Sequence, residues 1–281
     1  MTHRKIANTV QGNNAIDGAG VHLVRVLGLR TVKSYDPFLM LDIFDSDNPD
    51  DYVKGFPWHP HRGIETLTYL IEGEIEHGDS LGNSGKIGPG DCQWMRAGSG
   101  IIHQEMPLAA PKMKGFQLWL NMPAANKMDD PKYHDLLAEQ IGRYEDSEKT
   151  VRVIGGRWND VPGAMEGDYY PVNVFDIELR PNAEFRADID ADDNVFLYIF
   201  DGGLEFPDGQ QVAARRAILT THAAQLSVKA VGEDTRFILY SGPRLDEPVH
   251  WGGPIVMSTK EDLDLAFREL DEGTFIKHAG K

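Results

Sequence analysis

Residues 57–107 read PWHPHRGIETLTYLIEGEIEHGDSLGNSGKIGPGDCQWMRAGSGIIHQEMP. The stretch alternates between short β-branched or apolar runs and glycine-rich turns. Residues 66–71 form one such run, residues 88–91 (GPGD) form a strong turn, and residues 92–95 resume an extended pattern. Many short strands at this spacing are typical of a β-sandwich or a β-barrel.

The same pattern continues along the rest of the chain, at residues 116–120, 172–179, 195–200, 217–220 and 237–240. Helix signals are few. Asp130 followed by Pro131 predicts a short helix that reaches Leu137. Ser258 and Glu261 form a capping box that precedes an i, i+4, i+7 apolar stripe, Leu263, Phe267 and Leu270. The sequence therefore predicts an all-β protein with a few short helices, including one near the C-terminus.

A weak internal repeat divides the chain. Residues 69–76 (YLIEGEIE) resemble residues 198–205 (YIFDGGLE), and each segment is a predicted strand that enters and leaves a glycine turn. A chain of 281 residues is long enough for two copies of one β-domain. We expect domains at 1–141 and 150–281, joined by the polar stretch between them.

Charge and cysteine content exclude some classes of function. The chain has 44 acidic and 28 basic side chains and a net charge of −16, so neither nucleic acid nor an anionic membrane is an expected partner. Its single cysteine, Cys92, allows no internal disulfide. Because the sequence shows neither an apolar signal segment nor a membrane-length apolar run, we expect a soluble, cytoplasmic protein. The nucleus is an alternative location if the source is a eukaryote.

Three of the ten histidines fall into a pattern. His59 and His61 are two residues apart, a spacing that directs both side chains to one face of a strand, and His103 and Glu105 repeat it. The two pairs could supply three nitrogens and one oxygen to a metal ion. Imidazoles suit iron, copper, nickel and zinc, and an added carboxylate favours harder divalent ions. A single H-x-H is more often two ordinary surface or core histidines, but the matched second pair favours a metal.

Glu65 is a further candidate. It lies four residues after His61 and shares its face if the strand is regular. It would then be an acid/base group, a partner of a ligand, or a fifth ligand. A plain polar strand residue is an equally good interpretation.

These segments resemble the pirin family of the cupin superfamily, most specifically at residues 57–107, with similar segments at 36–44 (DPFLMLDIF) and 247–259 (EPVHWGGPIVMST). The resemblance implies a bicupin fold with two jelly-roll-like domains and one metal, typically iron, in the N-terminal domain. It implies His59, His61, His103 and Glu105 as the ligands, and it does not imply Glu65. Residues 190–198 (DADDNVFLY), where a second H-x-H would be sought, contain no histidine.

The resemblance also implies two kinds of function. Some pirins are similar to quercetin 2,3-dioxygenases, and others bind transcription factors or metabolic enzymes. Our leading hypothesis is a metal-dependent dioxygenase, with Fe(II) or another transition metal, that opens a flavonol ring; Glu105 or Glu65 would be the general base. The alternatives are a regulatory protein that docks through the acidic segments 42–51 and 188–193, and a protein whose metal only stabilises its fold.

Overall fold

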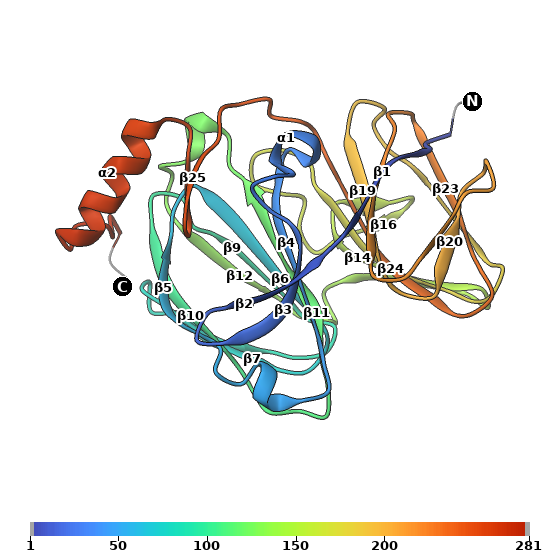
Figure 1. The fold of residues 1–281 in the computed structure, drawn as a ribbon, viewed down its shortest axis with the longest axis horizontal. Helices are drawn as coiled ribbons and strands as arrows, with labels where there is room; N and C mark the ends of the chain where they lie inside the picture. Colours follow the sequence, from blue (N-terminus) through green and yellow to red (C-terminus); the bar gives the residue numbers. More distant parts are fainter. Residues whose placement is uncertain (1–2, 279–281) are drawn as a thin grey trace. The chain divides into compact units, whose positions relative to one another are not determined.

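The computed structural model describes residues 3–278, and the chain forms two compact units (Figure 1). The first unit contains residues 13–138 and 245–278, and the second contains residues 3–12 and 139–244. Each unit consists mainly of antiparallel strands in a seven-stranded and a four-stranded sheet. The prediction of an all-β protein with two jelly-roll-like domains is confirmed, although the sheets stay open and do not close into a barrel.

The first unit has the strand order β12-β9-β6-β11-β4-β3-β2 in its large sheet and β5-β10-β7-β8 in its small sheet. The large sheet comprises β2 (Asn13–Asp17), β3 (Val21–Leu27), β4 (Phe38–Ser46), β6 (Ile64–Glu72), β9 (Cys92–Arg96), β11 (Met113–Asn121) and β12 (Lys132–Leu136). The small sheet comprises β5 (Phe56–His61), β7 (Ile75–Asp79), β8 (Ser84–Ile87) and β10 (Ile101–Pro107). The remaining elements are α1 (Val32–Tyr35), the short 3₁₀ helices at Pro49–Asp51 and Ala124–Asn126, the hairpin β25 (His250–Gly252) and β26 (Ile255–Met257), and α2 (Lys260–Asp271).

The second unit repeats this arrangement, with the orders β1-β22-β19-β24-β17-β14-β13 and β18-β23-β20-β21. Its large sheet comprises β1 (Ile6–Gln11), β13 (Gly142–Glu145), β14 (Lys149–Gly155), β17 (Asn173–Leu179), β19 (Asn194–Asp201), β22 (Arg216–Thr220) and β24 (Thr235–Gly242). Its small sheet comprises β18 (Glu184–Asp188), β20 (Gly203–Glu205), β21 (Gln211–Ala213) and β23 (Gln225–Ala230), and a two-stranded ribbon comprises β15 (Arg157–Trp158) and β16 (Val161–Pro162).

The internal repeat corresponds to equivalent strands. β6 and β19 are each third in a large sheet, and each leads into a strand of the small sheet, β7 or β20. The similar sequences at residues 69–76 and 198–205 therefore form the same strand–turn–strand segment in both units. The expected second copy of the β-domain is present, and β18 and β23 correspond to the strands that carry the histidines, β5 and β10.

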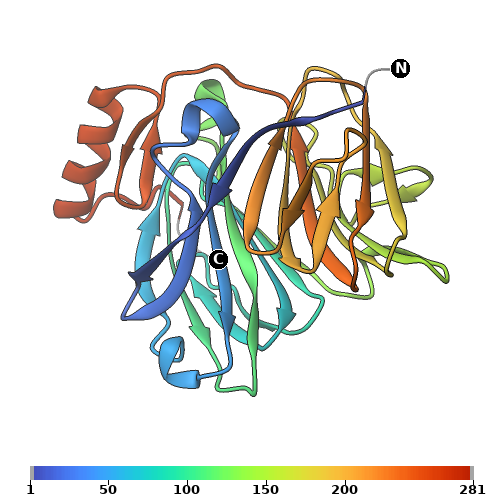
Figure 2. The same ribbon diagram turned by 45° about the vertical axis from the view of Figure 1, so that its right-hand side comes forward.

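Each end of the chain belongs to the unit that is farther away in sequence. The N-terminal segment joins the second unit and the C-terminal segment joins the first, so a single boundary between two halves of the chain does not describe the domains. β1 pairs with β22, and the buried guanidinium of Arg4 donates hydrogen bonds to the carbonyl oxygens of Asp190, Asp193 and Thr221. The C-terminal segment joins the first unit, where β25, β26 and α2 lie side by side (Figure 2). Arg62 fixes this segment through an ion pair of 2.8 Å with Glu269. The expected domains at 1–141 and 150–281 thus differ from the observed units at both termini.

Two local predictions are wrong. Residues 132–136 form β12, which pairs with β9 along its whole length, because pairing at a sheet edge outweighs the helix-start signal of Asp130 and Pro131. Helix α2 is capped by Thr259, whose Oγ1 accepts a hydrogen bond of 3.1 Å from the backbone of Asp262, and the predicted cap, Ser258, lies one residue earlier. No helix among residues 3–278 is long and apolar enough to cross a membrane.

Candidate metal centre

His59, His61 and His103 meet inside the first unit. The strands β5 and β10 are antiparallel, and their register places His103 directly opposite His59. The spacing of two along β5 then directs His61 to the same side. One ring nitrogen from each histidine lies within 4.8 Å of the other two. The structure therefore brings together the three predicted imidazole ligands.

Glycines on either side of β5 allow this close approach. Gly55 has φ of +61°, and a Cβ there would lie 2.7 Å from the carbonyl oxygen of Glu105. Gly63 has φ of +76°, and a Cβ there would lie 2.0 Å from the carbonyl oxygen of Val256. A side chain at either position would separate β5 from its neighbours, so both glycines are needed where the sequence places them.

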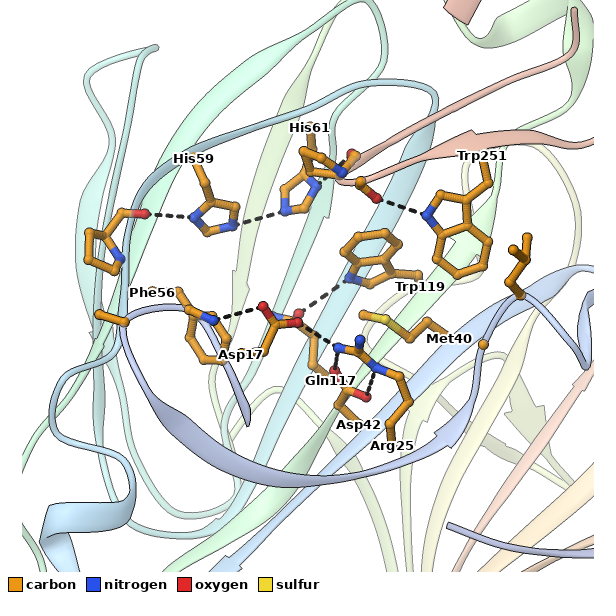
Figure 3. Close-up of a pocket in the computed structure, with 17 residues that line it drawn as sticks. Asp17, Arg25, Met40, Asp42, Phe56, His59, His61, Gln117, Trp119 and Trp251 are labelled. Atoms are coloured by element: carbon orange, nitrogen blue, oxygen red, sulfur yellow. Dashed lines mark hydrogen bonds and ion pairs between the residues drawn. The ribbon is translucent and has the colours of Figure 1, made fainter. Parts of the chain in front are cut away.

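Hydrogen bonds fix how two of the imidazoles face the site. His59 Nδ1 lies 2.9 Å from the carbonyl oxygen of Pro57, and His61 Nδ1 lies 3.0 Å from that of Pro254. A carbonyl oxygen only accepts, so Nδ1 carries the proton in each ring, and Nε2 keeps its lone pair. The two Nε2 atoms are 3.0 Å apart (Figure 3). Lone pairs this close repel each other unless a cation lies between them.

His103 completes the evidence for a cation. Its side chain is 0% exposed, and neither ring nitrogen has a hydrogen-bond partner among the described residues. Burial holds the pKa of His103 well below its usual range, and burial together with His59 lowers the pKa of His61 to about 3. Neutral imidazoles with unpaired nitrogens are what a transition metal binds. The donor set fits such an ion.

Glu105 is near the three histidines but points to other partners. Its Oε1 accepts hydrogen bonds from Thr68 Oγ1 at 3.1 Å and Gln117 Nε2 at 3.0 Å, and its Oε2 accepts from Gln117 Nε2 at 2.8 Å. The pairing of β10 with β5 shifts register between His103 and Glu105. The three-nitrogen group therefore forms without the carboxylate, and a fourth ligand from Glu105 stays a prediction.

Glu65 does not share a face with His61. Strand β5 ends at His61, and Glu65 belongs to the next strand, β6, whose regular pairing places it on the opposite face from Thr68. There Glu65 Oε2 accepts a 2.6 Å hydrogen bond from Trp94 Nε1. The assumption of one regular strand through both residues is wrong, because the chain turns at Gly63.

A cavity of about 800 Å³ opens beside the histidines (Figure 3). His59 and His61 line one side, and Trp119 and Trp251 form an aromatic wall, with their ring centroids 5.7 Å apart. Trp119 also packs edge-on against His61 at 5.0 Å. Trp251 comes from the C-terminal hairpin, almost 200 residues away in the sequence, so no local pattern identified it as a site residue.

Two further groups of side chains near the site were not predicted from the sequence. His77 is buried on β7, stacks on Tyr133 at 4.5 Å and lies 5.4 Å from the ring of His103. The proximity to His103 follows from the register between β7 and β10, which the sequence does not show. The ion-paired residues Asp17, Arg25 and Asp42 line the opposite side of the cavity, and no motif marks them.

Comparisons with known proteins agree with this geometry. The sequence profile described as Pirin matches residues 20–120, and that of the Pirin C-terminal cupin domain matches residues 174–276. The chain belongs to the pirin family. It is 41% identical to a pirin-like protein of Caulobacter vibrioides, over 98% of this chain and 100% of that protein. It is 39% identical to a Pseudomonas aeruginosa protein whose name marks it as a candidate quercetin 2,3-dioxygenase, over 96% of this chain and 98% of that protein.

Among solved structures, the pirin fold of this chain is similar to a crystal structure of quercetin 2,3-dioxygenase from Acinetobacter baumannii. The TM-score is 0.89 and the sequence identity 29%, and the match covers 98% of this chain and 99% of the other. The predicted resemblance to pirins is thus confirmed over nearly the whole chain.

Proposed function

We propose that this pirin is a metal-dependent dioxygenase of the quercetin 2,3-dioxygenase type, which opens the ring of a flavonol with O₂. The observation that carries the proposal is the group of three converging histidines beside an aromatic-walled cavity of about 800 Å³. A cavity of this size accommodates a small aromatic molecule. The similarity to a structure named quercetin 2,3-dioxygenase supports the choice of reaction.

The proposed ligands are His59, His61, His103 and Glu105, and the proposed metal is Fe(II), with other transition metals as alternatives. A bound metal would act as a Lewis acid toward the vicinal oxygens of the flavonol. Among the residues that the structure describes, Glu105 Oε2 accepts a hydrogen bond only from Gln117 Nε2 and keeps a second lone pair, which could bind the metal or accept a proton. Glu105 therefore remains the proposed base, whereas Glu65 faces away from the histidines and is bonded to Trp94.

The protein's own residues would hold the substrate in place. Trp119 and Trp251 present flat apolar faces to the cavity, which suits the planar rings of a flavonol. Pro57 and Pro254 supply the carbonyl oxygens that orient His59 and His61. Such partners fix the tautomer of a ligating histidine and keep its other nitrogen aimed at the metal.

The alternative of a regulatory protein receives no specific support from the acidic segments. Asp42 is buried and paired with Arg25, and the side chain of Asp51 accepts a hydrogen bond from Ser46. In the second segment, the carboxylate of Asp188 accepts a hydrogen bond from Gln225 Nε2, and that of Asp190 accepts one from the Asp192 amide. Several of these carboxylates therefore have structural partners and do not form a free docking face. A cytoplasmic location stays a prediction.

The test combines metal analysis with turnover on one sample. Protein purified without oxygen and loaded with Fe(II) should contain about one metal per chain and should consume a flavonol when O₂ is admitted. His59→Ala should reduce both metal content and turnover by at least about tenfold, the range for a disrupted metal site. His222→Ala, in the second unit, is the matched control and should change neither. A fully metal-loaded protein that leaves a panel of flavonols intact would falsify the proposal.

A further inference from the structure

An ion-paired cluster lies across the cavity from the histidines (Figure 3). We call Asp17, Arg25 and Asp42 the Arg25 cluster. Arg25 Nε and Nη2 donate to the two carboxylate oxygens of Asp42 at 2.9 and 2.7 Å, and Nη2 also donates to Asp17 Oδ2 at 2.6 Å. The three residues come from the neighbouring strands β2, β3 and β4, so the sheet itself fixes their positions.

The Arg25 cluster continues a polar row that crosses the large sheet. Gln117 on β11 is paired with Asp42 on β4, and Asp42 is paired with Arg25 on β3. Gln117 is the residue that holds Glu105. A ligand in the cavity would therefore lie along one continuous polar row, with Glu105 and the histidines at one end and the Arg25 cluster at the other.

Part of the Arg25 cluster is available to a ligand. The side chain of Asp42 is 4% exposed, whereas those of Arg25 and Asp17 are 34% and 49% exposed. Arg25 Nη1 makes no hydrogen bond among the described residues, and Asp17 retains accepting capacity beyond its bonds from Arg25 and the Gly18 amide. The cavity thus presents a donor and an acceptor side by side.

The charges of the Arg25 cluster restrict what it can bind. Although burial opposes ionisation, the hydrogen bonds from Arg25 and the Gly18 amide lower the pKa of Asp17, and the hydrogen bonds to Asp42 raise the pKa of Arg25. One guanidinium beside two carboxylates leaves a net charge of −1. An anionic group would be repelled by the two carboxylates, whereas a neutral hydroxyl can donate to Asp17 and accept from Arg25 Nη1.

We propose that the Arg25 cluster is a second binding subsite, which recognises neutral hydroxyl groups at the end of an aromatic ligand remote from the histidines. The subsite selects polyhydroxylated aromatic molecules over their unsubstituted or anionic analogues. The proposal rests on the proposed function for the class of ligand, but it concerns binding and is tested without turnover.

The experiment is calorimetric titration of the Fe(II)-loaded protein without oxygen. The two main probes are a flavonol with an unsubstituted phenyl ring and the same flavonol with two hydroxyls on that ring. Asp17→Ala should weaken binding of the dihydroxy probe about tenfold, since one hydrogen bond to a charged group is lost, and should change binding of the unsubstituted probe less than twofold. Asp47→Ala, an exposed acidic residue outside the cavity, is the matched control and should leave both affinities unchanged.

A third probe tests the charge argument. A flavonol with a sulfonate on the same ring should bind wild-type protein more weakly than the dihydroxy probe, and Asp17→Ala should strengthen its binding. Arg25→Gln removes Nη1 but leaves Asp42 buried without its cation, so it is used only if circular dichroism shows a native fold. Equal weakening of all probes by Asp17→Ala, no weakening, or no binding of any probe by the wild type would overturn the subsite.

The two proposals fail separately. Hydroxyl-dependent binding that Asp17→Ala removes, without any ring opening when O₂ is admitted, would retain the subsite and reject the dioxygenase. Ring opening of all flavonols at equal efficiency, with no effect of Asp17→Ala, would retain the dioxygenase and reject the subsite.

Discussion

The two units share their strand orders but differ in what their sheets enclose. In the first unit, β5 and β10 carry His59, His61 and His103 beside an open cavity. In the second unit, the corresponding strands β18 and β23 place apolar side chains in a continuous core: Phe185, Ala187, Leu226 and Val228. The same backbone arrangement therefore supports a hollow chemical site in one unit and a filled interior in the other.

The comparison separates the requirements of the fold from those of the site. In the second unit, Phe185 stacks on Trp158 with ring centroids 5.6 Å apart and packs edge to face against Phe237 at 5.8 Å. Such packing stabilises a jelly roll without any metal. The first unit gives up part of this packing for polar side chains, so its stability should depend more on ions, ion pairs and protonation.

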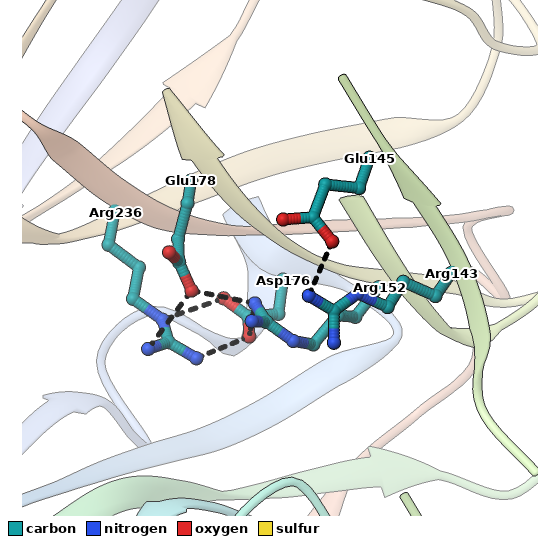
Figure 4. A network of polar contacts seen from close by, with 6 residues as sticks. All are labelled: Arg143, Glu145, Arg152, Asp176, Glu178 and Arg236. Atoms are coloured by element: carbon teal, nitrogen blue, oxygen red, sulfur yellow. Dashed lines mark hydrogen bonds and ion pairs between the residues drawn. The ribbon is translucent and has the colours of Figure 1, made fainter. Parts of the chain in front are cut away.

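Charge in the second unit gathers in an ion-paired network around Asp176, which binds Arg152 on β14 and Arg236 on β24 (Figure 4). Asp176 alternates with Phe175 and Ile177 of that core, so the network lies on the opposite face of the sheet.

We expect the two units to differ most in how much free energy of unfolding they lose when a phenylalanine is replaced by alanine. Phe237 is fully buried in the filled core, so Phe237→Ala should lower the free energy of unfolding by about 3–5 kcal/mol. Phe56 is partly buried and already borders the cavity, so Phe56→Ala should cost less than about 2 kcal/mol. Urea unfolding measures both values. Equal losses would show that the cavity does not loosen the first unit.

The sequence predicted the fold and the three histidines for the same reason. Short apolar runs, glycine turns and the spacing of two in H-x-H are local patterns, and a strand converts them directly into faces. The partnership of β5 with β10 followed from the matched pair at His103 and Glu105.

Residues that depend on distant pairing were not predictable in this way. β12 forms because β9 offers a sheet edge, despite a helix-start signal at Asp130. Trp251 and Pro254 reach the site only because the C-terminal segment returns to the first unit. Asp17, Arg25 and Asp42 form a cluster through the register of three strands, which no single-strand pattern contains. Glu65 was misplaced because Gly63 turns the chain between it and His61.

Metal binding should stabilise the protein through the first unit. A ligand that binds only the native state at a free concentration 100 times its dissociation constant adds about 2.7 kcal/mol to the free energy of unfolding. Fe(II) added without oxygen at that concentration should raise the free energy of unfolding, measured with urea, by about that amount, and a chelator should reverse the change. His103→Ala should abolish the increase, since it removes one of the three nitrogens.

The matched control for this prediction is His222→Ala in the second unit, which should keep the full metal response. A metal-dependent gain that survives in His103→Ala would place the bound ion elsewhere. If the metal-dependent increase in the free energy of unfolding is lost in both variants, the two units respond to the metal as one structure. The idea that only the first unit depends on the metal would then be wrong.

The smallest predicted effect is on the pH dependence of stability. Lys127 in the first unit is buried, donates to the backbone oxygens of Gly63 and Val256, and has its pKa lowered by burial to about 7. An unfolded lysine titrates near 10.4. Between these values the unfolded chain holds more protons, so stability should rise with pH by about 1 kcal/mol per pH unit near pH 8. Lys127→Gln should remove this slope, whereas Lys260→Gln, an exposed control, should retain it.

The second unit should show the opposite sign. Burial, followed by the nearby charge of Asp190, raises the pKa of Asp193 to about 6, whereas an unfolded aspartate titrates near 3.9. Between pH 4 and pH 6 the folded state therefore holds more protons, and its stability should fall as pH rises. The total change should be smaller than that of Lys127, because the pKa of Asp193 moves only from 3.9 to about 6, whereas that of Lys127 moves from 10.4 to about 7. Urea unfolding of Asp193→Asn should lose the acidic-range decline and keep the alkaline rise. If instead both variants altered the same pH range, the two interiors would not titrate independently.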